Sequence, residues 1–397
     1  MKKWRKLWAV LLLAAVASGC AQPGITAAED TAPSSGLVLT ALNIGKADCL
    51  LLQWRGHAFL IDAGYEQNAP LVAAMLAHYG VTRLNGVFLT HCHKDHYGGL
   101  AALAKSKIAV DAWYAAALYH DVETNQHPAA LAAAMRGQAP VYLRSGDIIS
   151  AGDDGAFTVL GPVDVNEDNE NNNSLVLRFA CPDGSILLAG DMKEDEEYDL
   201  LHANAFEKSD VLKVGHHGDG GATTLALLRA VQPAAAVIST SSREEYDTPS
   251  WNTLARLSAA GAQVYVTEKA RDAWELTLEK GRITAVDISL ANVPEKVDWL
   301  ALSIDAANDL LTIRCSGAAV SLAGCTLYST KGDEMLALPD ATLQNGQSYT
   351  VGSKATKGSF DLSWPVKRVW NKKKLDVGIL YDPFGRPIAC TDNGLSE

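Results

Sequence analysis

The stretch LTHCHKDHYGGL, residues 89–100, constrains this chain more than any other, because three histidines and an aspartate fall within six positions. The apolar residues GVFL that lead into it predict a buried strand, so the polar side chains follow the end of that strand. His91 and His93 are two apart and can point the same way from extended backbone. Asp95 and His96 open a predicted helix that turns them toward the first pair. Imidazole and carboxylate groups are ligands for zinc, manganese or iron, so the stretch predicts a site for two adjacent divalent metal ions rather than a solvated histidine loop.

Two later stretches supply further ligands of the same kind. ILLAGD ends in Asp191 at the end of a predicted strand, where its carboxylate is placed to bridge two metals. KVGHHG offers His216 and His217 at the end of another predicted strand. The remaining histidines are isolated, and we expect them to be structural or exposed: His57, His78, His120, His127 and His202.

The first twenty residues predict an export signal. MKKWRK is basic, and LWAVLLLAAVA is apolar but too short to span a bilayer comfortably. ASGC then resembles a bacterial lipobox in which Cys20 becomes lipidated, although Ala17 stands where leucine is usual. We therefore expect residues 1–20 to be a lipoprotein signal peptide and the protein to be anchored by lipid to the extracytoplasmic side of the cell membrane. Plain secretion and an uncleaved anchor are the alternatives.

The rest of the chain divides into a tether and two domains. Residues 21–36 are small, polar and Pro-containing, which predicts a flexible tether. From 37 to 292, runs of predicted strands followed by strands that alternate with helices predict a layered α/β domain. From 293 to 397, short apolar runs with Gly, Asp and Asn turns predict an all-β sandwich. The predicted helices of the first domain cover residues 69–80, 223–232 and 250–261.

Charge and cysteine content narrow the choice of function. The net charge is −12, and residues 21–292 alone carry −15. Such an acidic domain is a poor partner for nucleic acid over a broad surface, although a local site neutralised by metal stays open. The cysteines other than Cys20 are scattered, which favours buried thiols, and Cys315, Cys325 and Cys390 lie close enough in one segment for a single disulfide.

The ordered motifs LIDAG, THCHKDHYGG, LLAGD and HHG resemble the metallo-β-lactamase superfamily. Within that superfamily, NENNNSLVLRF before ILLAGD and DVLKVGHHGDGG after it resemble the hydrolase domain of ComEC-like DNA-uptake proteins. The resemblance spans residues 37 to about 290. It implies a four-layer αββα sandwich with a di-metal site at one edge of the sheets.

The resemblance also implies an assignment of the ligands. His91 and His93 would hold one metal, Asp95 and His96 would hold the other, and Asp191 would bridge them. The cofactors would be two divalent ions, with zinc as the first choice and manganese or iron as alternatives.

The HHG motif leaves one choice open. One of His216 and His217 would complete the shell of the second metal, and its neighbour would contact substrate. Neighbours on a strand face opposite ways, but the glycine that follows can break the strand. Our working assignment takes His217 as the ligand and His216, with Asp95 and Asp191, as catalytic.

The remaining site residues would act around the metals. Asp48 and Asp62 would orient ligands from behind. Most superfamily members have a further histidine before the bridging aspartate, where this chain reads NNNS, so Asn173 or water would serve one metal instead. This chain also has GKAD where ComEC-like sequences usually have Gly-Gln-Gly-Asp, and Thr248-Pro249 where they have His-Pro, which weakens any transfer of substrate.

The second domain has a relative of its own. VSLAGCTLYSTKGDEMLALPDATLQNGQSYTVGS, SWPVKRVW and DVGILYDPFGRPIAC resemble the lamin-tail domain, an immunoglobulin-like sandwich, with Cys325 where tryptophan is usual. Trp364 and Trp370 are expected to pack inside the sandwich. KRVWNKKK, residues 367–374, is a strong basic cluster that fits either a solvated loop or a phosphate-binding patch.

These patterns together predict an extracytoplasmic metal-dependent hydrolase. Phosphoester cleavage, as by a phosphodiesterase or nuclease acting on DNA or an envelope polymer, is the first choice, because the resemblance to ComEC-like proteins implies it and a dinuclear site can hold both the attacking and the leaving oxygen. Lactam or thioester hydrolysis is the alternative reaction. A third hypothesis makes the first domain a degenerate scaffold and the lamin-tail-like domain a binding module. The sequence indicates no particular protein partner.

Overall fold

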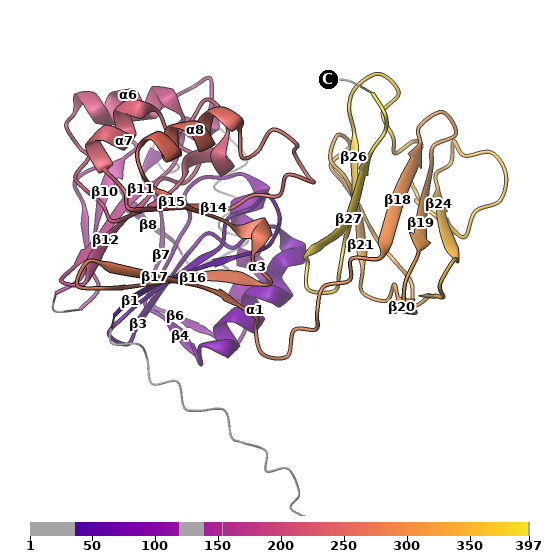
Figure 1. The fold of residues 1–397 in the computed structure, drawn as a ribbon, viewed down its shortest axis with the longest axis horizontal. Coiled ribbons are helices and arrows are strands. Elements are labelled where there is room, and N and C mark those ends of the chain that lie inside the picture. The colour runs from indigo at the N-terminus through magenta and orange to yellow at the C-terminus, as the bar shows by residue number, and fades with distance from the viewer. Residues whose placement is uncertain (1–35, 119–138, 153, 396–397) are drawn as a thin grey trace, which may run out of the picture. The chain divides into compact units, whose positions relative to one another are not determined.

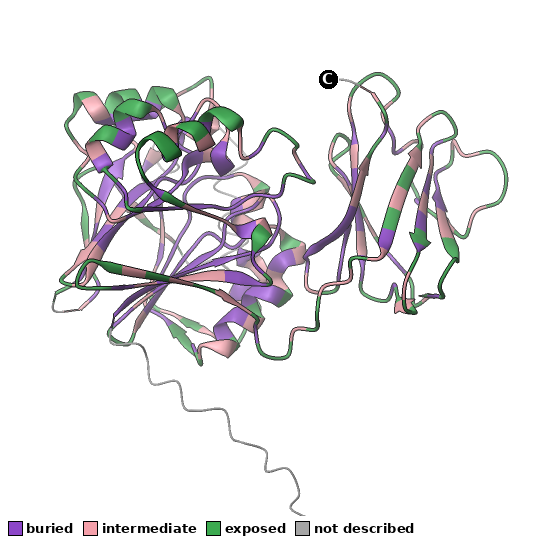
Figure 2. Cartoon of the chain, in the orientation of Figure 1, coloured by how far each residue is buried: buried purple, intermediate pink, exposed green. Residues whose placement is uncertain are grey.

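Two β-sheets packed face to face form the centre of the first domain in the computed structural model, which describes residues 36–118, 139–152 and 154–395 (Figure 1). Buried apolar side chains of both sheets join in one core, and the strands that carry them are largely coloured purple, as buried, in Figure 2. Phe59 and Phe88 from one sheet pack there against Phe157 from the other, with ring centroids 4.7–4.9 Å apart. The expected signal peptide, Cys20 and most of the tether lie outside the described residues and stay predictions, and His120 and His127 also lie outside them.

The first sheet is formed by both ends of the domain sequence. Its strands occur in the order β17 (Arg282–Ile288), β16 (Ala273–Glu279), β1 (Leu37–Leu42), β2 (Leu50–Trp54), β3 (His57–Ile61), β5 (Gly86–Phe88), β7 (Trp113–Ala116) and β8 (Val141–Leu143). A short pair, β4 (Arg83–Leu84) and β6 (Ala109–Val110), lies outside this order. Strands β16 and β17 were not predicted from the sequence; β16 returns the chain to β1 and pairs antiparallel with it, and β17 pairs antiparallel with β16. Only this long-range pairing shows that they complete the first sheet.

The second sheet changes from antiparallel to parallel along its width. Its order is β15 (Gln263–Val266), β14 (Ala235–Ile238), β13 (Val211–Lys213), β12 (Gly184–Leu188), β11 (Val176–Cys181), β10 (Ala156–Gly161) and β9 (Ile148–Ser150). Strands β12 to β15 run parallel, so the chain leaves them at the same edge of the sheet. That edge is where the HHG and LLAGD motifs lie.

Helices cover the outer faces of the sheets. In Figure 1, α6 (Glu194–His202), α7 (Leu225–Val231) and α8 (Trp251–Ala259) lie together on one face of the second sheet. Strand β14 shows why, because Ala235 and Val237 point into the core between the sheets while Ala236 and Ile238 pack in a second apolar cluster under these helices. On the side of the first sheet lie α1 (Ala69–His78), α2 (Lys94–Tyr97) and α3 (Leu100–Lys105). The predicted four-layer αββα arrangement is therefore confirmed.

The second domain is all β among its described residues. One sheet has the order β18 (Leu300–Asp305), β19 (Leu310–Cys315), β24 (Ser348–Gly352) and β25 (Leu362–Ser363). The other has β22 (Glu334–Ala337), β21 (Thr326–Ser329), β26 (Val377–Tyr381) and β27 (Pro387–Asp392), and β20 (Val320–Ser321) pairs with β23 (Thr342–Leu343). Trp364 and Trp370 are 2% and 1% exposed within its apolar core, as expected. The resemblance to a lamin tail stays a prediction.

The predicted boundary at residues 292 and 293 falls between β17 and β18, in a segment without regular structure among the described residues. Whether each domain folds alone stays a prediction. The structure records the described cysteines as free thiols, so the disulfide considered for the second domain is not formed in it. Within the described ranges, no helix has both the length and the apolar character that a membrane span requires.

Candidate metal centre

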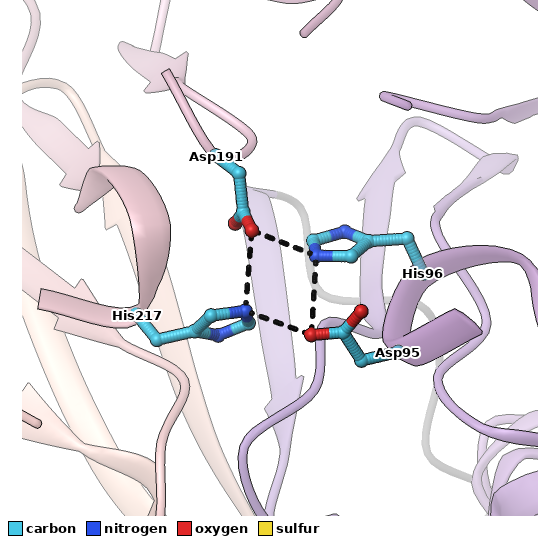
Figure 3. Close-up of side chains that lie close together, drawn as sticks. All are labelled: Asp95, His96, Asp191 and His217. Carbon is cyan, nitrogen blue, oxygen red and sulfur yellow. Dashed lines mark ion pairs between the residues drawn. The ribbon is translucent and has the colours of Figure 1, made fainter. Parts of the chain in front are cut away.

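The predicted ligand residues meet where strands of both sheets end. His91, His93 and the helix that carries Asp95 and His96 follow β5 of the first sheet. Asp191 follows β12 and His217 follows β13 in the second sheet. Residues about a hundred positions apart thus face one another across the edge of the sandwich, as Figure 3 shows for four of them.

Four of these side chains form a closed ring. The Asp191 Oδ2 atom lies 3.3 Å from His96 Nε2 and 3.4 Å from His217 Nε2. Asp95 Oδ2 closes the ring at 3.3 Å from His217 Nε2 and 3.9 Å from His96 Nε2 (Figure 3). One ligand atom from each residue lies within 4.8 Å of the others, so this set could hold one metal ion.

A second set shares Asp191 with the first. His91 Nε2 lies 2.8 Å from His93 Nδ1 and 3.6 Å from Asp191 Oδ2. These three residues also offer ligand atoms within 4.8 Å of one another. The Asp191 carboxylate therefore stands between two groups of ligand atoms, which is the position that a bridging carboxylate needs.

The HHG turn directs two neighbouring histidines to the same side. His216 and His217 have φ angles of 42° and 54°, in the left-handed region that residues with a side chain seldom adopt. An extended strand would point them to opposite faces, but this turn brings both Nε2 atoms within 4 Å of Asp191 Oδ2. His217 Nδ1 lies 2.8 Å from the Ser239 carbonyl oxygen and donates to it, so its Nε2 faces the ring. His216 Nε2 lies 3.2 Å from the Asn171 amide instead.

Asp62 holds His96 from behind. Its Oδ2 lies 2.7 Å from His96 Nδ1, and it accepts hydrogen bonds from the Thr90 backbone N–H at 2.8 Å and the Thr90 hydroxyl at 2.7 Å. With a proton on Nδ1, the His96 imidazole turns the lone pair of Nε2 toward the centre of the four side chains, where a metal would bind. The sequence analysis did not single out Thr90, although it directly precedes His91 in the motif.

Asp48 lies behind His217 and forms an ion pair that the sequence analysis did not identify. Lys213 Nζ lies 2.8 Å from Asp48 Oδ2, and both side chains are 1% exposed. Asp48 Oδ1 lies 3.8 Å from His217 Nδ1. A lysine inside the apolar stretch DVLKVG was the available signal, because a buried lysine requires a partner for its charge.

The NNNS segment contributes different residues from the one expected. The Asn173 amide is hydrogen bonded to the Asn166 backbone and the Glu170 carboxylate. Asn171 reaches His216, and the Ser174 hydroxyl accepts a hydrogen bond from the Asp191 backbone N–H at 3.0 Å. The last contact fixes the backbone of the shared carboxylate.

Two glycines allow this close assembly. A Cβ atom on Gly99 would lie 2.2 Å from the Ala63 carbonyl oxygen, so a side chain there would push the motif helix away from the strand end that carries Asp62. Gly190, directly before Asp191, has a φ of 54° and an added Cβ would lie 3.0 Å from Thr90.

The ring has the charge and the free atoms that a cation site requires. Burial by itself would raise the pKa of Asp191, but the His217 and His96 imidazoles hold it well below the usual value. Burial would lower the pKa of His217, and the Asp191 and Asp95 carboxylates outweigh it and raise that pKa to about 9. His96 Nε2, His217 Nε2 and Asp191 Oδ1 are buried without a hydrogen-bond partner among the described residues. Buried polar atoms normally have partners, so atoms of this type converging on one point fit a divalent cation.

Asp62→Asn is expected to lower zinc affinity about 10- to 100-fold, the usual effect of losing an outer contact to a metal-binding histidine. The amide carries no negative charge and cannot accept from both His96 and Thr90 as the carboxylate does. Titration of the purified protein with zinc against a competing chelator measures this. Asp111→Asn removes an exposed carboxylate paired with Arg83 and should leave the affinity unchanged, and equal affinities in the two variants would contradict a role for Asp62.

Comparison with known proteins places these residues in a family. The family model of the metallo-beta-lactamase superfamily matches residues 43–242, about half of the chain and the segment that carries every residue of the ring. The chain is similar to ComE operon protein 3 of Bacillus subtilis (strain 168), with 28% identity over 220 residues that cover 54% of this chain and 27% of that protein. It is also similar to Competence protein ComA of Neisseria gonorrhoeae, with 26% identity over 283 residues that cover 70% of this chain and 36% of that protein.

The match therefore spans only a minor part of the length of these relatives. Among solved structures, the metallo-beta-lactamase fold protein YhfI from Bacillus subtilis aligns over 63% of this chain and 100% of its own, with 12% identity and a TM-score of 0.37, a likeness too low to carry an argument. The family model, the order of the motifs and the sandwich they stand on agree, and this chain belongs to the metallo-beta-lactamase superfamily.

Proposed function

We propose that this protein is a metal-dependent hydrolase of phosphodiester bonds that works with two divalent ions. The observation that supports this best is the position of Asp191, whose carboxylate lies between one group formed with His91 and His93 and another formed with Asp95, His96 and His217. A site of this form suits an in-line displacement at phosphorus, where the attacking and the leaving oxygen both need stabilisation. Zinc is the first choice for ligands of this kind, and manganese and iron are alternatives.

The ions, when bound, would acidify water and offset the negative charge that develops on the phosphoryl oxygens. The residues of the chain would fix the positions of the ligand atoms. Asp62 and the Ser239 carbonyl fix the proton on Nδ1 of His96 and His217, and so keep both Nε2 atoms available as ligands. The Ser174 hydroxyl holds the Asp191 backbone, so the shared carboxylate keeps its place between the two groups.

His216 is the group that we propose contacts substrate. Its side chain is 17% exposed, whereas His91, His96 and His217 are fully buried. Its pKa is lowered by burial, while the nearby Asp191 opposes the shift. The Asn171 amide nitrogen lies 3.2 Å from Nε2 and orients the imidazole, which leaves Nδ1, without a hydrogen-bond partner among the described residues, to donate to a non-bridging or leaving oxygen.

Support for a phosphodiester comes from both the site and the relatives. The two curated relatives are named as competence and ComE operon proteins, and this chain is similar to the part of them that it matches. The intact ligand set speaks against a degenerate scaffold, because side chains without a function would not retain several unpaired buried ligand atoms.

A substrate screen tests the proposal. The full-length protein, loaded in parallel with zinc or manganese, is offered a phosphodiester, a phosphomonoester, a β-lactam and a thioester. We expect turnover of the diester to exceed that of the other three by at least about tenfold and to disappear on removal of metal by a chelator. Preference for the lactam or the thioester would overturn the proposed reaction while leaving the metal centre in place.

A further inference from the structure

A large cleft is lined by residues of both domains. Its volume is about 1060 Å³. One wall comes from the loop around Tyr246 in the first domain, and the other comes from β21, β26, β27 and their connections in the second domain. A cleft of this size is larger than a single small diester would need.

The cleft lies next to the loops that position the metal ligands. Lys46 and Tyr65 line it, and they stand two and three residues from Asp48 and Asp62. On the other side, Lys94 of the metal motif forms an ion pair with Asp333 in the turn between β21 and β22. Burial would lower the pKa of Lys46, but Glu245, Asp95 and Asp191 outweigh it and raise the pKa, so the field of the ligand carboxylates reaches this wall.

Three exposed basic side chains line the cleft without an acidic partner. Arg243, Lys331 and Lys374 lie within ion-pair distance of no carboxylate among the residues that the structure describes. Three acidic residues also line the cleft: Glu245 is paired with Lys46 at 2.5 Å, burial raises the pKa of Glu244 to about 7, and the exposed Asp392 accepts a hydrogen bond from the Gly394 backbone N–H. In a chain with a net charge of −12, unpaired positive charge gathered in one cleft marks a site for an anion.

The backbone beneath two of these cations is held firmly. The Asp376 carboxylate, 1% exposed, accepts hydrogen bonds from the Lys331 backbone N–H and the Ser329 hydroxyl. The Asn393 amide donates to the Lys374 carbonyl oxygen at 2.9 Å. Buried polar residues of the second domain therefore present Lys331 and Lys374 toward the cleft from fixed positions.

Aromatic side chains accompany the positive charge. Tyr246 is 70% exposed at the edge of the cleft. Tyr65 and Tyr328 come from opposite walls, with ring centroids 6.3 Å apart. Basic groups that follow a phosphate backbone, combined with aromatic faces for bases, are the pattern of proteins that bind single-stranded nucleic acid.

We propose that this cleft binds a single nucleic acid strand and leads it to the metal centre, with Lys331 and Lys374 of the second domain contacting its phosphates. The inference rests on the proposed phosphodiesterase activity and names its substrate class. It gives the second domain a role in substrate selection. It also assigns one member of the basic cluster at residues 367–374, Lys374, to phosphate binding, while Arg368 of the same cluster pairs with the buried Asp309.

The test compares two double variants of the full-length protein that lose the same charge from the same domain. Lys331→Ala/Lys374→Ala removes the two cleft cations, and Lys354→Ala/Lys357→Ala removes two exposed lysines outside the cleft. Binding of a fluorescent 12-mer of deoxythymidine is followed by anisotropy from about 50 to 200 mM salt. For the cleft variant we expect about tenfold weaker binding and a log–log salt slope smaller by roughly 1.4, since each contact to a single strand contributes about 0.7.

Turnover completes the test. In the cleft variant, the ratio of kcat/KM on the oligonucleotide to kcat/KM on bis(p-nitrophenyl) phosphate is expected to fall about tenfold, while the control keeps the wild-type ratio. An unchanged ratio and salt slope in the cleft variant would overturn the inference and leave the proposed hydrolysis standing. Binding that depends on Lys331 and Lys374 without any diester hydrolysis would support the cleft and overturn the proposed function. Displacement of the oligonucleotide by poly(glycerol phosphate) at equal phosphate concentration would overturn the assignment to nucleic acid.

Discussion

Asp191→Asn is expected to leave the fold intact while the protein loses at least one metal ion and its hydrolytic turnover falls about a hundredfold or more. The Oδ2 atom of Asp191 lies within 4 Å of the Nε2 atoms of His91, His96, His216 and His217. A carboxylate there lowers the repulsion between two cations, whereas an amide of the same shape carries no charge to do so. Metal per chain by elemental analysis, turnover on the best substrate and a thermal melt measure the three effects.

The matched control is His57→Asn, at the start of β3 and outside both ligand groups. It should keep the metal content and turnover of the wild type. If Asp191→Asn retains two metals and wild-type turnover, the shared-carboxylate assignment is wrong and the roles of the histidines around it must be reassigned.

Arg386→Leu is expected to lower the free energy of unfolding by about 3–5 kcal/mol, the usual effect of removing one member of a buried charge network. Arg386 is 2% exposed and lies 2.7 Å from both Asp272 and Asp382, and it also donates to the Pro294 carbonyl oxygen at 2.9 Å. Leucine would leave two carboxylates buried without their cation. Because Asp272 belongs to the first domain and Asp382 to the second, the variant also weakens the contact between them.

Denaturant-induced unfolding of the purified variant measures the change. Arg83→Leu is the control, because Arg83 pairs with Asp111 at 2.6 Å but is 66% exposed, and exposed pairs contribute only about 0–1 kcal/mol. A midpoint for Arg386→Leu equal to that of the control would show that the buried network does not stabilise the protein.

Local sequence patterns accounted for most of the first domain. Alternation and apolar runs predict strands such as β12 and β14, because the side chains of a strand alternate between two packed faces. Helices α1, α7 and α8 fall inside the ranges predicted for them, since capping residues and helical spacing act over a few positions. The missed strands β16 and β17 lie at the far end of the domain sequence, and the place of β16 beside β1 depends on pairing across more than two hundred residues.

The metal centre was likewise predicted in part from local sequence patterns and in part decided by packing. The residue types and spacing of the motifs were enough to predict that His91, His93, Asp95, His96 and Asp191 would come together, because each motif follows a strand end and the sheets bring such ends to one edge. The sequence could not distinguish His216 from His217, since the left-handed backbone of the HHG turn is set by the packing around it. Asn173 was expected near a metal, and its amide is hydrogen bonded within its own loop.

The sequence by itself determined the family, the α/β and all-β halves and the ligand types, because these depend on composition and spacing over short stretches. Only the tertiary structure decided which residues hold the metal ligands from behind and which cleft the second domain lines. The buried pair of Lys213 and Asp48 and the cleft with Lys331 and Lys374 join residues more than a hundred positions apart. Contacts of that range follow from how the sheets and domains pack, and no local pattern in a single sequence specifies them.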